Sequence, residues 1–74
     1  MEIELRLFAN LRETHIPEGK VGLEDEATVG ELLEKIQLSP SKAAVVLVNG
    51  LHARFEHRLN DGDRVAIFPA IAGG

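Results

Sequence analysis

Residues 2–7 alternate between charged and apolar side chains. Because successive side chains of a β-strand point to opposite faces, this alternation predicts a strand with one buried and one solvent-facing side. The apolar side would be formed by Ile3, Leu5 and Leu7. Residues 8–13 lose the alternation and indicate a helical turn or short helix, with Phe8 and Leu11 turned inward.

Residues 20–24 alternate again after a loop that contains a proline and a glycine. We expect them to form a short second strand, paired with the first as a hairpin. Val21 and Leu23 would then face the core.

Residues 28–38 carry the pattern of an amphipathic helix. Thr28 followed three residues later by Glu31 matches a capping box, in which each side chain accepts a hydrogen bond from an N–H at the start of the helix. The apolar positions recur at i, i+3, i+4 and i+7, and are Val29, Leu32, Leu33 and Ile36. Pro40 disfavours helical geometry at the residue before it, so we expect the helix to end near Leu38.

Residues 43–48 are continuously apolar and end at Asn49-Gly50, a strong signal for a tight hairpin turn. A run of this kind predicts a central strand buried on both faces, with residues 51–55 as the short return strand. Asp61-Gly62-Asp63 indicates a further turn, in which the glycine supplies a positive φ.

Residues 64–68 form the last predicted strand, with Val65 and Ile67 on one face and Ala66 and Phe68 on the other. Pro69 has no N–H to donate to a neighbouring strand and should end it. Two strands, a helix and three more strands predict an α+β domain of the β-grasp type: one mixed sheet of about five strands gripping one main helix. We expect this domain to span residues 1–69, and residues 70–74 to form a flexible C-terminal tail.

Composition limits the classes of function. The chain has 74 residues, a net charge of −4 and no cysteine, which excludes disulfides, thiolate metal sites and a cysteine nucleophile. The negative charge and the scarcity of aromatic residues argue against nucleic-acid binding. No apolar run reaches the length of about 18 residues that suggests a membrane span, and we expect a cytoplasmic protein with no membrane partner.

The residues show no self-contained active site, and whether the chain takes part in an enzyme stays open at this point. The three histidines lack carboxylates at a spacing typical of metal ligands, and no phosphate-binding loop or hydrolase serine motif occurs. We therefore expect no metal and no bound cofactor. The chemical group that remains is the α-carboxylate of Gly74, which we expect at the end of a narrow arm. Coupling to AMP would make it reactive in a closed site of a partner enzyme, and Gly73 and Gly74 would fit such a tunnel because they lack a Cβ.

Four segments of the chain together match a known pattern. The most specific is the run from Leu59 to Gly74 with Asp61-Gly62-Asp63, Phe68-Pro69 and the final Gly-Gly. The other segments are Phe8-Ala9-x-Leu11-Arg12-Glu13, Thr28-Val29-x-Glu31-Leu32-Leu33 and Val48-Asn49-Gly50. With these segments the chain resembles the MoaD family, the small sulfur-carrying subunits of molybdopterin synthase, which are related to the thiamine sulfur carrier ThiS and to ubiquitin-like proteins.

The resemblance implies a cycle with three partners. A MoeB/ThiF-like adenylyltransferase would adenylate Gly74 with ATP, and a persulfide-bearing sulfurtransferase would convert it to a thiocarboxylate. The tail would then enter the large, MoaE-like subunit of molybdopterin synthase and give its sulfur to a pyranopterin precursor, which builds the dithiolene that binds molybdenum or tungsten. Because the chain has no cysteine, the terminal carbonyl is the place where it can hold transferable sulfur.

The resemblance also implies which residues meet the partners. Gly74 would carry the chemistry, and the partner-binding residues would be Phe68, Pro69, Ala70, Ile71, Ala72 and Gly73. Ala70 replaces the second proline of the common family ending, which leaves φ unrestricted by a ring. Three alternatives stay open: a ThiS-like carrier for thiamine or another thiolation pathway, a ubiquitin-like modifier that acylates lysines through Gly74, and an adaptor whose tail does no chemistry.

Overall fold

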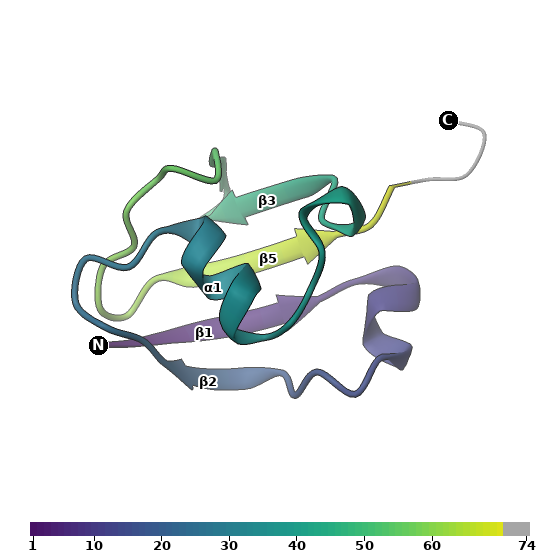
Figure 1. The fold of residues 1–74 in the computed structure, drawn as a ribbon, viewed down its shortest axis with the longest axis horizontal. Coiled ribbons are helices and arrows are strands. Elements are labelled where there is room, and N and C mark those ends of the chain that lie inside the picture. The colour runs from purple at the N-terminus through teal and green to yellow at the C-terminus, as the bar shows by residue number, and fades with distance from the viewer. Residues whose placement is uncertain (71–74) are drawn as a thin grey trace.

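The computed structural model describes residues 1–70 and contains a five-stranded mixed sheet with one α-helix across one face (Figure 1). The order of the strands across the sheet is β2-β1-β5-β3-β4. The elements along the chain are β1 (Glu2–Leu7), the 3₁₀ helix η1 (Ala9–Glu13), β2 (Gly19–Gly22), α1 (Val29–Lys35), the 3₁₀ helix η2 (Pro40–Lys42), β3 (Val45–Val48), β4 (Leu51–His52) and β5 (Arg64–Phe68).

β5 is the central strand, with β1 parallel to it on one side and β3 antiparallel on the other. The strand covers the predicted residues 64–68, and the predicted antiparallel hairpin of the first two strands is also confirmed. Each neighbour aligns with a residue of β5, for example Leu5 of β1 with Val65 and Val48 of β3 with the same Val65. This alignment places the apolar positions of the three strands on one side of the sheet.

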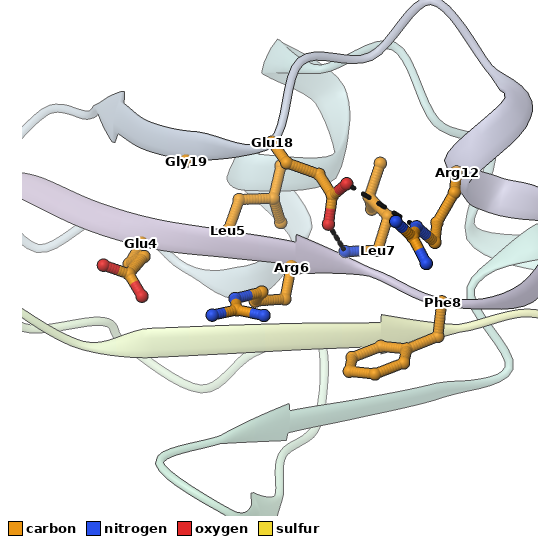
Figure 2. A pocket seen from close by; sticks show the side chains of 8 residues that line it. All are labelled: Glu4, Leu5, Arg6, Leu7, Phe8, Arg12, Glu18 and Gly19. Carbon is orange, nitrogen blue, oxygen red and sulfur yellow. Dashed lines mark hydrogen bonds and ion pairs between the residues drawn. The ribbon is translucent and has the colours of Figure 1, made fainter.

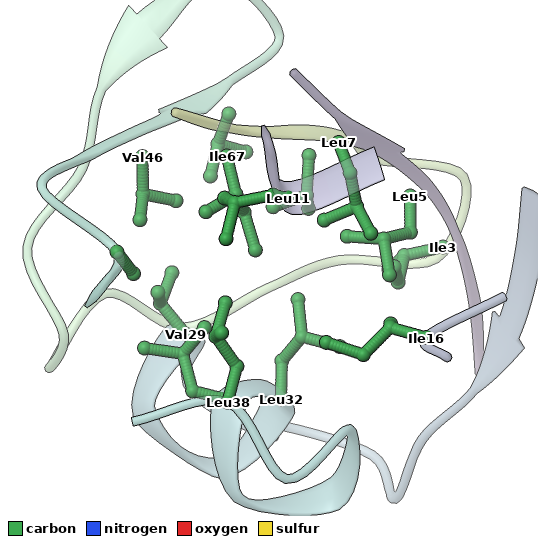
Figure 3. Packing of buried hydrophobic residues seen from close by; sticks show 14 of the residues in the cluster. Ile3, Leu5, Leu7, Leu11, Ile16, Val29, Leu32, Leu38, Val46 and Ile67 are labelled. Carbon is green, nitrogen blue, oxygen red and sulfur yellow. The ribbon is translucent and has the colours of Figure 1, made fainter. Parts of the chain in front are cut away.

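The covered side holds the core between the sheet and α1 (Figure 3). The side chains that are at most 2% exposed come from β1, α1, β5 and the segment before the last turn; they are Ile3, Leu5, Leu7, Val29, Leu32, Leu33, Leu59, Val65 and Ile67. Val21 and Leu23 pack against this cluster, as predicted. Apolar burial of this kind contributes about 25 cal/mol per Å² and is the main favourable term in folding.

The start of α1 is the predicted capping box. The Thr28 hydroxyl accepts a hydrogen bond from the Glu31 N–H at 3.2 Å, and Glu31 Oε1 accepts one from the Thr28 N–H at 3.0 Å. The predicted end near Leu38 is wrong, because α1 ends at Lys35. Gln37 takes φ 59°, and the Leu38 N–H donates to the Leu33 carbonyl at 2.9 Å. This is a Schellman motif, which ends a helix ahead of any effect of Pro40.

Two expectations for the β3–β4 hairpin need correction. β3 is not a central strand buried on both faces: Val46 and Val48 are buried, whereas Val45 and Leu47 are half-buried on the side away from α1. β4 is also shorter than the predicted return strand, residues 51–55. The predicted tight turn is confirmed, since Asn49 has φ 53° and Gly50 has φ 85°.

The arrangement of one mixed sheet around one main helix is the predicted α+β, β-grasp fold. The covered side buries the apolar positions, and within residues 1–70 no helix lies on the opposite side of the sheet (Figure 1). The division into a domain of residues 1–69 and a tail of residues 70–74 stays a prediction.

Candidate functional site

The chain leaves the sheet at the end of its central strand. Phe68 and Pro69 are half-buried there and Ala70 is exposed. Pro69 and Ala70 line a hollow of about 280 Å³ together with residues of η1 and η2, among them Leu11 and Lys42. The two 3₁₀ helices therefore flank the root of the C-terminal segment.

Phe68 is stacked on Phe8, which follows the end of β1. The ring centroids lie 4.3 Å apart and the ring planes differ by 11°. Phe8 is 38% exposed, so the prediction that it turns inward is wrong, whereas Leu11 is buried as expected. The side chains continue to alternate for one residue beyond β1. Phe8 therefore lies on the other side of the sheet from Leu7, beside the parallel strand β5. The result is an aromatic pair at the point where the tail begins.

We use the term open face for the side of the sheet that α1 does not cover. Three adjacent strands contribute to it: Glu4, Arg6 and Phe8 from β1 and its end, Arg64, Ala66 and Phe68 from β5, and Val45 and Leu47 from β3. Leu47 aligns with Ala66, and Val45 aligns with Phe68. An apolar strip therefore runs from the middle of the sheet to the aromatic pair. Continuous apolar surface on a small domain marks a site of protein–protein contact.

A second hollow, of about 480 Å³, lies beside the end of β1 (Figure 2). β2 reaches only as far as Leu5 in the pairing with β1, and the Leu7 N–H beyond it donates to Glu18 Oε2 at 2.9 Å. The other oxygen of Glu18 lies 3.9 Å from Arg12 Nε. Arg12 is thus exposed and held beside this hollow by a surface ion pair, an interaction that contributes at most about 1 kcal/mol.

The predicted site residues fall into two groups. The structure brings Phe68, Pro69 and Ala70 together at the root of the tail. Ile71, Ala72, Gly73 and Gly74 lie outside the described residues, so the predicted chemical group stays a prediction. Sequence patterning missed Phe8 as a member of the site, because the charged/apolar alternation of residues 2–7 breaks at Phe8, an apolar residue at a position where a charged one would continue the pattern.

Groups that could support other chemistry are few in the described part of the chain. His15, His52 and His57 are exposed, and residues 1–70 contain no cluster of three possible metal ligands. Asp63 is the one buried charged residue among them, and its carboxylate accepts hydrogen bonds from Asn49 Nδ2 at 2.9 Å and from the Asn60 N–H at 2.7 Å. These bonds fix a turn. Within residues 1–70, no helix has the length and apolar character to cross a membrane.

The fold and the site together define a class of protein. Its members have a ubiquitin-like domain whose C-terminal segment leaves from the end of the central strand. Within that class, the chain matches the sequence profile of the ThiS family over residues 5–74. The chain therefore belongs to the ThiS family, and the predicted membership of the MoaD/ThiS superfamily of ubiquitin-like sulfur carriers and modifiers is confirmed.

The chain is also similar to individual proteins. Small archaeal modifier protein 3 from Haloferax volcanii is 32% identical, and the match covers all of both chains. The crystal structure of SAMP1 from Haloferax volcanii superposes with a TM-score of 0.77 at 28% identity over the whole of both chains. A complex of subunits 1 and 2 of molybdopterin-converting factor from Helicobacter pylori contains a chain with a TM-score of 0.58 at 22% identity, again over the whole of both chains. At that identity the likeness to the Helicobacter protein shows the fold alone.

Proposed function

We propose that this protein is a sulfur carrier that works through the carboxylate of Gly74, as the small subunit of molybdopterin synthase. The observation that supports this best is the position of the tail root: β5, the central strand, ends at an aromatic pair on the open face. The chain continues from Phe68 for six residues to a Gly-Gly ending. A folded body with an apolar face beside the start of its C-terminal segment suits delivery of that segment into a partner.

The chemistry proposed for the arm has two steps. A carboxylate oxygen of Gly74 attacks the α-phosphorus of ATP on a MoeB/ThiF-like adenylyltransferase, and pyrophosphate leaves. Sulfur from a persulfide-bearing sulfurtransferase then replaces AMP at the acyl carbon, and reduction of the resulting S–S bond by a thiol leaves the thiocarboxylate. The chain has no cysteine of its own to hold sulfur, so the first step activates the terminal carboxylate and the second places sulfur on its carbonyl carbon. ATP consumption fits the cytoplasm, where we propose that the cycle runs.

The open face would guide the arm into its acceptor. An arm of residues 70–74 spans at most about 18 Å when fully extended, because each residue adds no more than about 3.6 Å. The acceptor must therefore bind close to the tail root to reach Gly74. Phe68, with the Phe8 ring stacked on it, lies at the centre of the surface that such a partner would cover. We propose a MoaE-like large subunit in this position and a pyranopterin precursor as the sulfur acceptor.

Protein modification is the second candidate, and the match to small archaeal modifier protein 3 favours it. In that function the activated Gly74 would acylate a lysine of a target protein and AMP would leave. The same body and tail root would serve, because activation of the carboxylate is common to both functions. A ThiS-like role in another thiolation pathway differs only in the acceptor of the sulfur.

One assay separates these functions. The purified chain is incubated with the adenylyltransferase of its organism, ATP and a persulfide donor, and its intact mass is measured. A gain equal to the replacement of one oxygen by sulfur supports the carrier, and transfer of that sulfur to a pterin in the presence of the large subunit supports molybdopterin synthesis. Adducts on lysines of added proteins support the modifier. If AMP formation is seen on a control carrier but the mass of this chain stays unchanged, both proposals are wrong.

A further inference from the structure

Two arginines lie on the open face, one on each of two adjacent strands. Arg6 of β1 aligns with Ala66 of β5, and Arg64 precedes Ala66 by two residues on the same face. Both arginines are exposed, whereas Ala66 is half-buried. They line a hollow of about 280 Å³ whose apolar lining includes Leu47 and Ala66. Figure 2 shows Glu4, Arg6 and Phe8 on one side of β1, so the arginine lies in line with the aromatic pair.

The two guanidinium groups make no ion pair with any residue between Met1 and Ala70. Some other exposed cations do have partners: Arg58 contacts Glu26 at 3.0 Å, and Lys20 contacts Glu2 at 4.0 Å. Lys35, Lys42 and Arg54 are exposed without an ion pair in residues 1–70, but none of them lies on the open face. Glu4 is the carboxylate that faces Arg64 in the register of β1 and β5, and no ion pair joins the two. The guanidinium groups of Arg6 and Arg64 thus lie beside the apolar strip and are exposed to solvent.

Arg64 is held rigidly at its backbone. Its N–H donates to Asn49 Oδ1 at 2.9 Å, and its carbonyl accepts from the Asn49 N–H at 2.8 Å. Asn49 is in turn held by the buried carboxylate of Asp63 at 2.9 Å. These bonds link the β3–β4 turn to the start of β5. They fix the point from which the Arg64 side chain extends, which lowers the entropy lost when a partner binds it.

This surface fits a particular kind of protein partner. A guanidinium group is weakly hydrated, binds carboxylates through two parallel hydrogen bonds and is enriched at the centres of interfaces. Nucleic acid is a poor fit, because the chain carries a net charge of −4 and Glu2 and Glu4 lie on the same side of β1 as Arg6. We propose that the hollow between Arg6 and Arg64 receives an aspartate or glutamate side chain from an apolar surface of the large subunit that accepts the tail. The proposal rests on the proposed carrier function and adds the chemistry by which the partner is selected.

The test measures binding of the large molybdopterin-synthase subunit from the same organism to four forms of the chain. These are the unmodified protein, Arg6→Glu, Arg64→Glu and the control Arg54→Glu. Arg54 is exposed, has no ion pair within residues 1–70 and lines a different hollow, beside Phe55. We expect each open-face variant to raise Kd by about tenfold or more, because a carboxylate would then face a carboxylate. The Kd of the control Arg54→Glu should stay within about twofold of the unmodified value, because its charge lies outside the interface.

Two further measurements make the test decisive. Binding by the unmodified chain should weaken with salt more steeply than binding by either variant, since screened charge pairs contribute less. Replacing the partner's carboxylate by lysine should restore affinity for Arg6→Glu or Arg64→Glu. Equal Kd values for all four forms at low salt would overturn the proposal, as would equal losses in the variants and the control. Thiocarboxylate formation is assayed on the same samples, so a chain that carries sulfur and binds without these arginines refutes the inference and leaves the carrier function standing.

Discussion

The two faces of the sheet use the same strands for different tasks. On the covered face, Val65 and Ile67 of β5 are fully buried under α1. On the open face, Ala66 and Phe68 of the same strand stay half-buried, and Arg64 is exposed. Because side chains alternate along a strand, five consecutive residues supply both the core and the proposed recognition surface. Stability and partner binding should therefore respond separately to substitutions only one residue apart.

The largest expected effect concerns neither face. Deletion of Gly74, or extension of the chain beyond it, should abolish thiocarboxylate formation, because the acyl group that accepts AMP is lost or moved. The circular dichroism spectrum and the melting temperature should stay unchanged, since the core lies within residues 3–67. Intact mass after incubation with adenylyltransferase, ATP and sulfur donor gives the answer. An extended chain that still gains sulfur would contradict the mechanism.

Ile67→Ala tests the covered face. Ile67 is 0% exposed, and truncation of a buried Ile to Ala lowers the free energy of unfolding by about 2–5 kcal/mol. Urea denaturation measures the loss. Ile67→Val removes one methylene and should cost about 0.5–1.5 kcal/mol, so it remains folded and measurable where the alanine variant is too unstable. At temperatures where it is folded, Ile67→Val should bind the large subunit as the unmodified chain does; a weaker Kd would show that the two faces are coupled.

Phe68→Ala tests the open face one residue further along. We expect the loss of binding to exceed about 2 kcal/mol, because an aromatic residue at the centre of an interface is a typical hot spot. The free energy of unfolding should fall by only about 1–2 kcal/mol, since the ring is half-buried and loses its stacking on Phe8. Calorimetric titration of the large subunit measures the first quantity and urea denaturation the second. A variant that loses more stability than Ile67→Ala but no affinity would reverse the assignment of the faces.

Local signals in the sequence predicted much of the fold. The capping box at Thr28, the tight turn at Asn49-Gly50 and the bounds of β5 each follow from neighbouring residues, and each is confirmed. The features that patterning missed depend on residues far apart in the chain. Phe8 faces outward to stack on Phe68, sixty positions later, and the apolar character of Leu47 serves the open face rather than a second buried side.

For the candidate site, too, local signals predict some residues and miss those that the fold brings together. Motif resemblance predicts Phe68 and the tail as site residues, which stays a prediction. The position of Arg6 beside Arg64 depends on the parallel register of β1 and β5, which no local pattern specifies. The buried carboxylate of Asp63 is another case: it looked like a turn residue, and its bond to Asn49 joins two turns fourteen residues apart. Residue types suffice to predict a reactive group at a chain end, whereas a prediction of the surface beside it requires the fold.

The smallest expected effect comes from a substitution at the start of α1, which covers one face of the sheet. Thr28→Ala removes the hydroxyl that accepts from the Glu31 N–H and leaves that donor unpaired at the start of α1. Loss of an N-cap of this kind lowers the free energy of unfolding by about 1 kcal/mol, and Thr28→Ser, which keeps the hydroxyl, should lose much less. The large subunit should bind both variants with unchanged Kd, because α1 packs only on the covered face. If Thr28→Ala is as stable as Thr28→Ser, the capping box contributes nothing, and if its affinity falls, α1 influences the open face through the sheet.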